Sequence, residues 1–135
     1  MPGSFFDTNV LLYIASDDPK SDQAEKIVGD GGAISVQVLN ELANIARRKM
    51  RMPWRDTRRF LSLLRGLLTV HPVTVETHEM GLALAERYKL STYDAMIAAA
   101  ALQADCDTLW SEDMQHRMML EDRLRIINPF RMASK

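Results

Sequence analysis

Hydrophobic positions along the chain fall into short continuous runs and into longer stretches with helical spacing. The short runs predict five strands, which are "SFFD", "AIS", "TVHPV", "CDTLW" and "LRIIN". The longer stretches predict helices around residues 10–15, from Ser21 to Val28, over 36–50, from Pro53 to Leu68, and over "ETHEMGLALAERYK" and "STYDAMIAAAALQAD". Short apolar strands that alternate with helices are typical of an α/β domain, in which a mainly parallel sheet lies between helical layers.

Two of the predicted helices differ in how they should be buried. In residues 36–50, Val38, Leu42 and Ile45 form an apolar stripe, and Ser35 is placed to cap the helix. The stretch "STYDAMIAAAALQAD" is apolar nearly all the way round, which predicts a central position. The chain has no repeat and no long linker, so we expect one domain over residues 1–135. In parallel sheets of this kind, sites form at the carboxyl ends of the strands.

The composition excludes several classes of protein. No apolar stretch approaches the roughly 20 residues needed to cross a bilayer, so no membrane contact is expected. The first residues lack the basic and apolar regions of a secretory signal, which predicts a cytoplasmic location. One cysteine and three scattered histidines offer no cluster of zinc ligands. The usual glycine-rich nucleotide-binding motifs and the G-x-S-x-G motif of serine hydrolases do not occur.

The formal net charge of −1 hides an uneven distribution of charge. The segment 47–65 contains eight cations and one acid, a net charge of +7, so the remainder of the chain carries −8. The densest part of this basic segment comprises Arg47, Arg48, Lys49 and Arg51. A basic stripe suits a polyanion, but it suits the solvated face of a helix equally well.

Four acids lie at the ends of predicted strands or beside the buried faces of predicted helices. Asp7 follows the first strand and Asp113 follows "CDTLW" by three residues, so parallel strands would place both at one edge of the sheet. Asp94 begins the most buried helical stripe in the molecule. Glu41 lies at the rim of the apolar face of its helix.

Each acid also has an ordinary structural interpretation. Asp7 and Asp113 would suit helix N-caps, Asp94 would suit a capping box with the serine three residues before it, and Glu41 would suit an ion pair with Arg48. Taken together, carboxylates in one polar notch repel one another and resist burial, so their coexistence favours a divalent cation. Oxygen ligands alone suit Mg²⁺ or Mn²⁺.

These segments resemble, in order and approximate spacing, the acidic motifs of the PIN-domain nucleases. The segments are "FFDTNVLLY", "SVQVLNELANIARRK", "STYDAMIAAAAL" and "LWSEDMQH". The set is most similar to the VapC toxins of bacterial toxin–antitoxin pairs, and the resemblance runs from residue 4 to about residue 130, including "RIINPF". It implies a three-layer α/β/α sandwich, which agrees with the fold predicted from the hydrophobic pattern.

The resemblance also implies roles for individual residues, every one of them an expectation. It makes four residues the metal-binding and catalytic acids, namely Asp7, Glu41, Asp94 and Asp113. It assigns Asn9 and Ser111 to supporting polar positions. At the position of Ser111, most members of the family have threonine. Three of the acids would hold one or two Mg²⁺ ions, which Mn²⁺ would replace, and Glu41 would bind metal or orient the attacking water.

The resemblance further implies an RNA substrate, a homodimer and a cognate VapB-type antitoxin whose tail lies over the active-site groove. Contact with operator DNA would come only through the antitoxin. The basic residues Arg47, Arg48, Lys49 and Arg51 would then contact either RNA or an acidic antitoxin tail. The sequence identifies neither the RNA that is cleaved nor the fold of the antitoxin.

Two other functions stay open at the level of the sequence. A catalytically silent PIN-like module would bind RNA or protein without cleavage, but a pure binder gains nothing from crowded carboxylates. A phosphatase would use Asp7 as a phosphate-accepting nucleophile, and such enzymes commonly carry a second acid two residues on. Here that position is Asn9. We therefore expect a magnesium-dependent endoribonuclease toxin.

Overall fold

A computed structural model describes residues 3–132 of the chain, so the ends of the expected domain, residues 1–2 and 133–135, lie outside it. Its centre is a sheet with the strand order β3-β2-β1-β4-β6-β5. The first five of these strands are parallel, and β5 pairs with β6 in the antiparallel direction. The strands are β1 (Ser4–Phe6), β2 (Ala33–Ser35), β3 (Thr69–His71), β4 (Thr108–Trp110), β5 (Met119–Leu120) and β6 (Leu124–Ile127).

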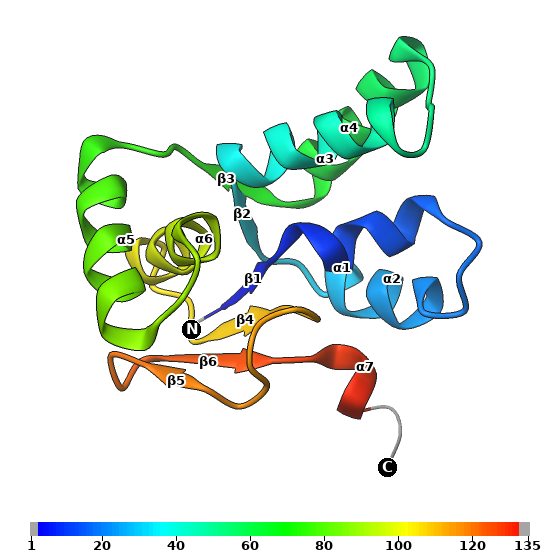
Figure 1. Cartoon of the computed structure of the whole chain (residues 1–135). Coiled ribbons are helices and arrows are strands. Elements are labelled where there is room, and N and C mark those ends of the chain that lie inside the picture. Colours follow the sequence, from blue (N-terminus) through cyan, green and yellow to red (C-terminus); the bar gives the residue numbers. More distant parts are fainter. Residues whose placement is uncertain (1–2, 133–135) are drawn as a thin grey trace.

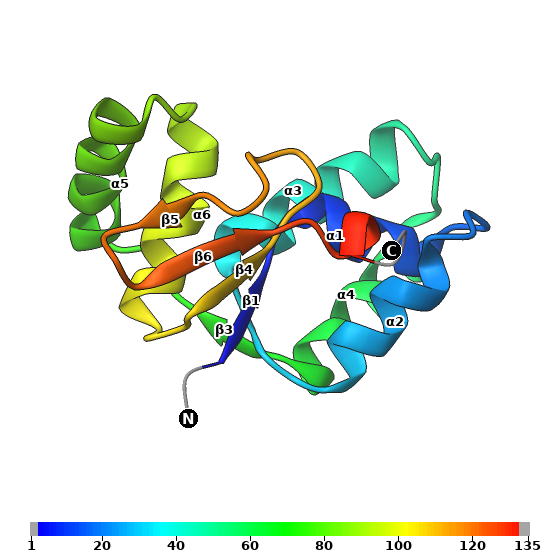
Figure 2. The ribbon, with the colours of Figure 1, turned by 90° about the horizontal axis from the view of Figure 1, so that it is seen from below.

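Helices cover both faces of the sheet, which confirms the predicted α/β/α sandwich (Figure 1). One layer contains α1 (Thr8–Leu12), its 3₁₀ continuation η1 (Tyr13–Ala15), α2 (Ser21–Gly29), α3 (Val36–Arg48), α4 (Trp54–Leu67) and the short α7 (Pro129–Met132). The other layer contains α5 (Val75–Tyr88) and α6 (Thr92–Gln103), on the opposite side of the sheet in Figure 2. From β1 to β3 each new strand is added on one side of β1, and from β4 onward strands are added on its other side. Because crossovers between parallel strands are right-handed, the helices that connect the two groups of strands lie on opposite faces of the sheet.

Helix α6 lies at the centre of the molecule, as its apolar sequence predicts. Every residue from Ala95 to Leu102 is buried, between α5 and the sheet. Ser35 caps helix α3, because its hydroxyl accepts a hydrogen bond from the Val38 N–H at 3.4 Å, so the predicted cap is confirmed. The longest helices have 14 residues, and within residues 3–132 none is both long and apolar enough to span a membrane.

Two short elements are absent from the prediction based on the sequence. Strand β5 has two residues and helix α7 has four, so neither carries a periodic hydrophobic signal. The pairing of β5 with β6 depends on a tight turn in which Glu121 and Asp122 both have positive φ. The sheet therefore has six strands instead of the expected five, and the additional strand lies at its edge.

Candidate active site

The carboxyl ends of the parallel strands form the edge of the sheet at which the predicted site residues gather. Asp7 follows β1 directly, and Asp113 follows β4 by three residues. Because β1 and β4 are parallel neighbours with Phe6 opposite Trp110, the segments after them emerge side by side. Helix α3, with Glu41, begins directly after β2 at the same edge. The predicted convergence of Asp7 and Asp113 is thus confirmed.

Asp7 is the most buried of the four acids, with 3% of its surface exposed. One carboxylate oxygen accepts a hydrogen bond from the Thr8 N–H at 2.7 Å, which makes Asp7 the N-cap of α1. The other accepts from the Ser111 hydroxyl at 2.7 Å and from the Asn9 amide at 3.2 Å. The capping interpretation is therefore correct, but it accounts for only one of the two oxygens.

Burial raises the pKa of Asp7 from 3.8 to about 6. The hydrogen bonds from Ser111 and Thr8 act in the opposite direction, because they favour the charged carboxylate. The negative charges of Asp94 and Glu41 raise the pKa further. These three acids therefore share one electrostatic environment.

Asn9 joins Asp7 to Asp113 through a single amide group. Its Nδ2 donates to Oδ2 of both acids, at 3.2 Å and 3.0 Å. Its Oδ1 accepts from the Glu112 N–H at 3.0 Å. The position needs a donor and an acceptor on one short side chain, and an aspartate would lack the donor. Asn9 therefore links the two acids by hydrogen bonds.

Glu41 is held by two residues to which the sequence pattern assigns no role. The Thr8 hydroxyl donates to one of its oxygens, and Gln37 Nε2 donates to the other at 3.0 Å. Thr8 thereby connects Glu41 to Asp7, to which its N–H also donates. The ion pair between Glu41 and Arg48 that the sequence suggests does not occur among the described residues. Thr8 and Gln37 lie in the first turns of α1 and α3, where polar residues are ordinary, so no signal in the sequence identifies them.

Asp94 is half-buried in the first turn of α6. Its N–H donates to the Ser91 hydroxyl at 3.2 Å, so this serine caps the helix. Burial is the largest cause that raises the pKa of Asp94, and the charges of Asp113 and Glu41 raise it further, against a hydrogen bond with Ser91. Asp113, by contrast, caps no helix, because the chain forms turns and bends after β4.

The loop after β4 is fixed by a cluster around Glu112. The Glu112 carboxylate accepts a hydrogen bond from the Tyr13 hydroxyl at 2.6 Å and forms an ion pair with Lys20. Its backbone carbonyl accepts from Asn128 Nδ2 at 3.5 Å. Ser111, the residue directly before Glu112, is fully buried and donates a hydrogen bond to Asp7. The loop that carries Asp113 is therefore anchored to both η1 and the segment after β6.

The basic segment reaches the site along α3. Arg47 stacks its guanidinium on the Trp54 ring at 4.2 Å and donates to the Met52 carbonyl at 2.7 Å, so it is partly engaged. Three further cations are exposed, namely Arg48, Lys49 and Arg51. Lys49 and Asn9 line the same cavity of about 370 Å³ between α1 and α3. This cavity therefore connects the end of the basic segment to Asn9, the residue that links Asp7 to Asp113.

The four acids fit a hard cation by their chemistry, since each of them offers carboxylate oxygen alone. Their charges act on one another, and a bound cation would relieve this repulsion. In the part of the chain from residue 3 to residue 132, however, no three His, Cys, Asp or Glu side chains are close enough to hold a metal ion. Three carboxylates could share one ion only after side-chain rotation.

Comparison with known proteins identifies the family. The family model described as "PIN domain" matches residues 4–119, and the chain belongs to the PIN domain family. No curated protein matches the sequence.

Solved structures with the same fold are distant in sequence. A toxin–antitoxin complex from Klebsiella pneumoniae has a TM-score of 0.71 and 22% identity, over 93% of this chain and 97% of that chain. VapC20 from Mycobacterium tuberculosis, a toxin that cleaves the sarcin-ricin loop, has a TM-score of 0.68 and 19% identity, over 82% and 89%. VapBC2 from Rickettsia felis, bound to a promoter DNA fragment, has a TM-score of 0.66 and 19% identity, over 93% and 97%.

Proposed function

We propose that this protein is a Mg²⁺-dependent endoribonuclease toxin of a toxin–antitoxin pair, with Mn²⁺ as a substitute metal. The observation that carries the proposal is the hydrogen-bond network at one edge of the sheet, in which Asn9 links Asp7 to Asp113 and Thr8 links Asp7 to Glu41. Membership of the PIN domain family supports it, as do folds shared with toxin–antitoxin complexes. A bound Mg²⁺ would supply a Lewis acid that activates water and offsets charge on the phosphate oxygens.

The side chains of this chain would divide the work of binding and orientation. Asp7, Asp94 and Asp113 would hold the metal, and the hydrogen bonds from Asn9 would keep two of them together. Ser111 donates to Asp7 and so favours its charged form. The ionised form is the one that a metal requires.

Glu41 would orient the attacking water by accepting a hydrogen bond from it. Both Glu41 oxygens are already held, by the Thr8 hydroxyl and by Gln37, which fixes the direction of the carboxylate. A fixed acceptor reduces the freedom of the water before attack, and such positioning lowers the barrier. The exposed Arg48, Lys49 and Arg51 would contact RNA phosphates beyond the reacting one.

A cognate VapB-type antitoxin would block this site, and its acidic tail would meet the same basic residues. The Rickettsia felis complex, which has the same fold, contains an antitoxin and a promoter DNA fragment, and this supports a partner of that kind. We propose that the toxin acts as a homodimer and reaches operator DNA only through the antitoxin.

Two alternatives are disfavoured by particular contacts. A catalytically silent binding module gains nothing from the repulsion among Asp7, Asp94 and Glu41, which capping does not require. A phosphatase that uses Asp7 as a nucleophile commonly carries a second acid two residues on, and here Asn9 occupies that position and donates to Asp7. A metal-dependent nuclease requires acids held in this way.

RNA cleavage by the purified protein tests the proposal. The unmodified protein should cleave single-stranded RNA with Mg²⁺ and lose this activity in EDTA. Asp94→Asn should reduce the rate by at least about 100-fold, because it removes a metal ligand without changing side-chain size. The matched control is Asp30→Asn, which alters an exposed acid after α2 and should cleave at the normal rate.

The outcome is decided by the comparison of the two variants. Circular dichroism should show that Asp94→Asn is folded, since its carboxylate is half-buried and repelled by its neighbours. Equal cleavage by the Asp94→Asn and Asp30→Asn proteins would overturn the assignment of Asp94. Activity that persists in EDTA would overturn the metal dependence.

A further inference from the structure

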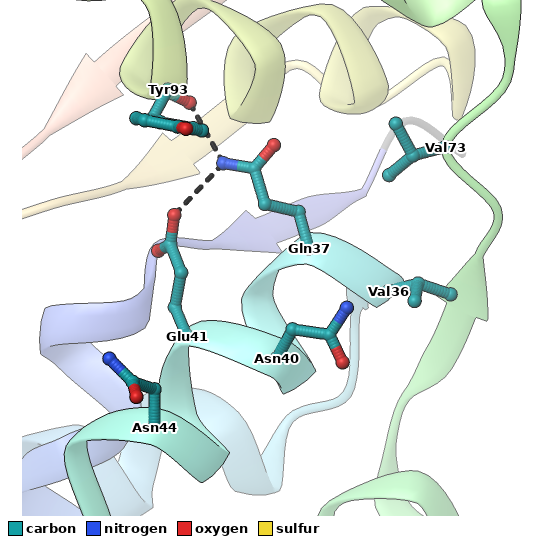
Figure 3. A pocket seen from close by; sticks show the side chains of 7 residues that line it. All are labelled: Val36, Gln37, Asn40, Glu41, Asn44, Val73 and Tyr93. Atoms are coloured by element: carbon teal, nitrogen blue, oxygen red, sulfur yellow. Dashed lines mark hydrogen bonds between the residues drawn. The ribbon is translucent and has the colours of Figure 1, made fainter. Parts of the chain in front are cut away.

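A second pocket lies beside the four acids and is not needed to hold a metal. Its volume is about 380 Å³, which is within the range of small-ligand sites. We call it the amide pocket; its lining residues are Val36, Gln37, Asn40, Glu41, Asn44, Val73 and Tyr93. Figure 3 shows the lining of this pocket; Glu41 belongs both to it and to the acidic site, so the pocket adjoins that site.

One face of α3 supplies three amide side chains to the pocket. Gln37, Asn40 and Asn44 share this face with Glu41 at helical spacing. Gln37 Nε2 is occupied, because it donates to Glu41 and to the Tyr93 carbonyl at 3.0 Å each (Figure 3). Within residues 3–132 the Asn40 and Asn44 side chains have no hydrogen-bond partner. Each therefore offers a free donor and a free acceptor to a ligand.

The walls of the pocket suit a flat, uncharged ring. Tyr93 is 70% exposed, and it is the residue directly before Asp94. Val36 and Val73 provide exposed apolar surface at the other end of the pocket. Among the described residues that line it, Glu41 is the only charged one, so a phosphate or an acidic peptide would be repelled. An aromatic face together with free amide groups is the chemistry that recognises an unpaired nucleobase.

We propose that the amide pocket binds an unpaired RNA base next to the phosphate that the acidic site cleaves. The Tyr93 ring stacks on this base, and Asn40 and Asn44 form hydrogen bonds with its edge. The proposal rests on the proposed ribonuclease function, because only RNA in the acidic site places a base here. It makes Tyr93 a binding residue and the two asparagines determinants of base preference.

Cleavage of designed oligoribonucleotides tests the base pocket. One set varies each nucleotide around the cleaved bond, and a matched oligonucleotide lacks the base at the preferred position. Tyr93→Ala should lower kcat/KM roughly 5- to 100-fold on RNA that has the base, since stacking is lost. On the abasic RNA, Tyr93→Ala and the unmodified protein should be equal. Tyr93→Phe keeps the ring and should stay within about 2-fold of the unmodified protein.

The asparagines have a different expected effect. The double variant Asn40→Ala/Asn44→Ala should flatten the preference among the four bases, because hydrogen bonds to the base edge carry the discrimination. All variants change exposed side chains, so none should melt at a lower temperature than the unmodified protein, and the double alanine variant should be equally or slightly more stable. Unchanged kcat/KM in Tyr93→Ala, or an equal loss on abasic RNA, would overturn the proposal.

A binding measurement separates this proposal from the ribonuclease function. Fluorescence anisotropy with labelled oligoribonucleotides, with Ca²⁺ in place of Mg²⁺, reports affinity without cleavage. If the unmodified protein cleaves no RNA, the ribonuclease proposal fails. The binding measurement then tests by itself whether the amide pocket binds a base. Weaker binding by Tyr93→Ala to RNA that has the base, and not to abasic RNA, supports the pocket. Equal binding by the unmodified and Tyr93→Ala proteins overturns it.

Discussion

Asp7 has one observed role, as the cap of α1, and one proposed role, as a metal ligand, and the two place opposite demands on its surroundings. As the cap of α1 it can be buried, and it is almost completely inaccessible to solvent. As a metal ligand it must be ionised, although burial raises its pKa to about 6. Donors from Ser111, Asn9 and Thr8 reduce this conflict, and a bound cation would remove it. The metal-free protein should therefore have a measurable electrostatic cost at neutral pH.

This cost predicts a dependence of stability on pH. The unfolded chain releases the Asp7 proton near pH 4 and the folded protein releases it near pH 6, so rising pH between these values favours the unfolded chain. Asp7→Asn cannot ionise. In EDTA, its free energy of unfolding should improve relative to that of the unmodified protein by about 2 kcal/mol between pH 4 and pH 7. Urea denaturation at the two pH values measures this, and a constant difference would contradict the raised pKa.

Ser111 supports the charged form of Asp7 and should contribute to stability. Its hydroxyl donates to Asp7 at 2.7 Å and accepts from the Met114 N–H at 3.2 Å, and the residue is fully buried. Ser111→Ala should lower the free energy of unfolding by about 1 to 3 kcal/mol, with the larger loss at neutral pH. The control Ser62→Ala removes an exposed hydroxyl and should change it by less than about 0.5 kcal/mol. Equal changes in unfolding free energy for Ser111→Ala and Ser62→Ala, measured by urea denaturation, would show that the hydrogen bond from Ser111 to Asp7 does not stabilise the fold.

At the scale of elements, the site depends on how closely β2 approaches β1. Gly32 lies just before β2 and has a φ of +151°, a conformation that other residues rarely adopt. A Cβ there would lie 2.7 Å from the Ser4 carbonyl oxygen and 2.6 Å from the Phe6 ring. Only glycine fits this contact, which lies where β2 pairs with β1, the strand that leads to Asp7.

Substitution of this glycine should destabilise the whole fold. Gly32→Ala combines backbone strain with a clash against main chain and should cost at least about 2 kcal/mol of unfolding free energy. The control is Gly29→Ala, at the end of α2, where a Cβ would meet nothing within 4 Å. That variant should be unchanged or slightly more stable, because alanine favours the helix. Thermal melting compares the two, and equal melting temperatures would contradict the tight contact.

The sequence predicts the elements better than the interactions between them. It predicts that Asp7 and Asp113 converge, because residues that follow parallel strands meet at one edge. It does not predict the roles of Thr8 and Gln37, because the Thr8 partner Glu41 is 33 residues away and only packing brings them together. Strand β5 is not predicted either, since two residues carry no periodic pattern. Local pattern therefore predicts the order of strands and helices and the convergence of Asp7 and Asp113, while the hydrogen-bond network requires tertiary structure.

At the scale of the whole molecule, charge is separated between two surfaces. The acids gather at the carboxyl edge of the sheet, and the exposed Arg48, Lys49 and Arg51 extend from the end of α3. Lys49 lines a cavity together with Asn9, so the two regions meet. A polyanion that lies across this junction would contact cations on one side and the proposed metal site on the other.

This arrangement predicts how RNA binding responds to salt. The triple variant Arg48→Gln/Lys49→Gln/Arg51→Gln should reduce the slope of log K against log salt by about 0.7 for each phosphate that it no longer neutralises. A control that replaces Lys26, Arg123 and Arg125, which lie toward the opposite edge of the sheet, should keep the slope. Anisotropy titrations over a range of salt concentrations measure both slopes. Equal slopes would assign the basic residues to the antitoxin instead.

The most direct test of a shared cation site is the effect of Mg²⁺ on thermal stability. Binding to the folded state alone should stabilise the unmodified protein by about 2.7 kcal/mol at 100 times the Kd, and Asp30→Asn should respond equally. Asp94→Asn should start more stable in EDTA, because it relieves repulsion from Asp113 and Glu41, and should gain much less from Mg²⁺. Equal Mg²⁺-induced shifts in Tm for the unmodified and Asp94→Asn proteins would contradict a cation site shared by these acids.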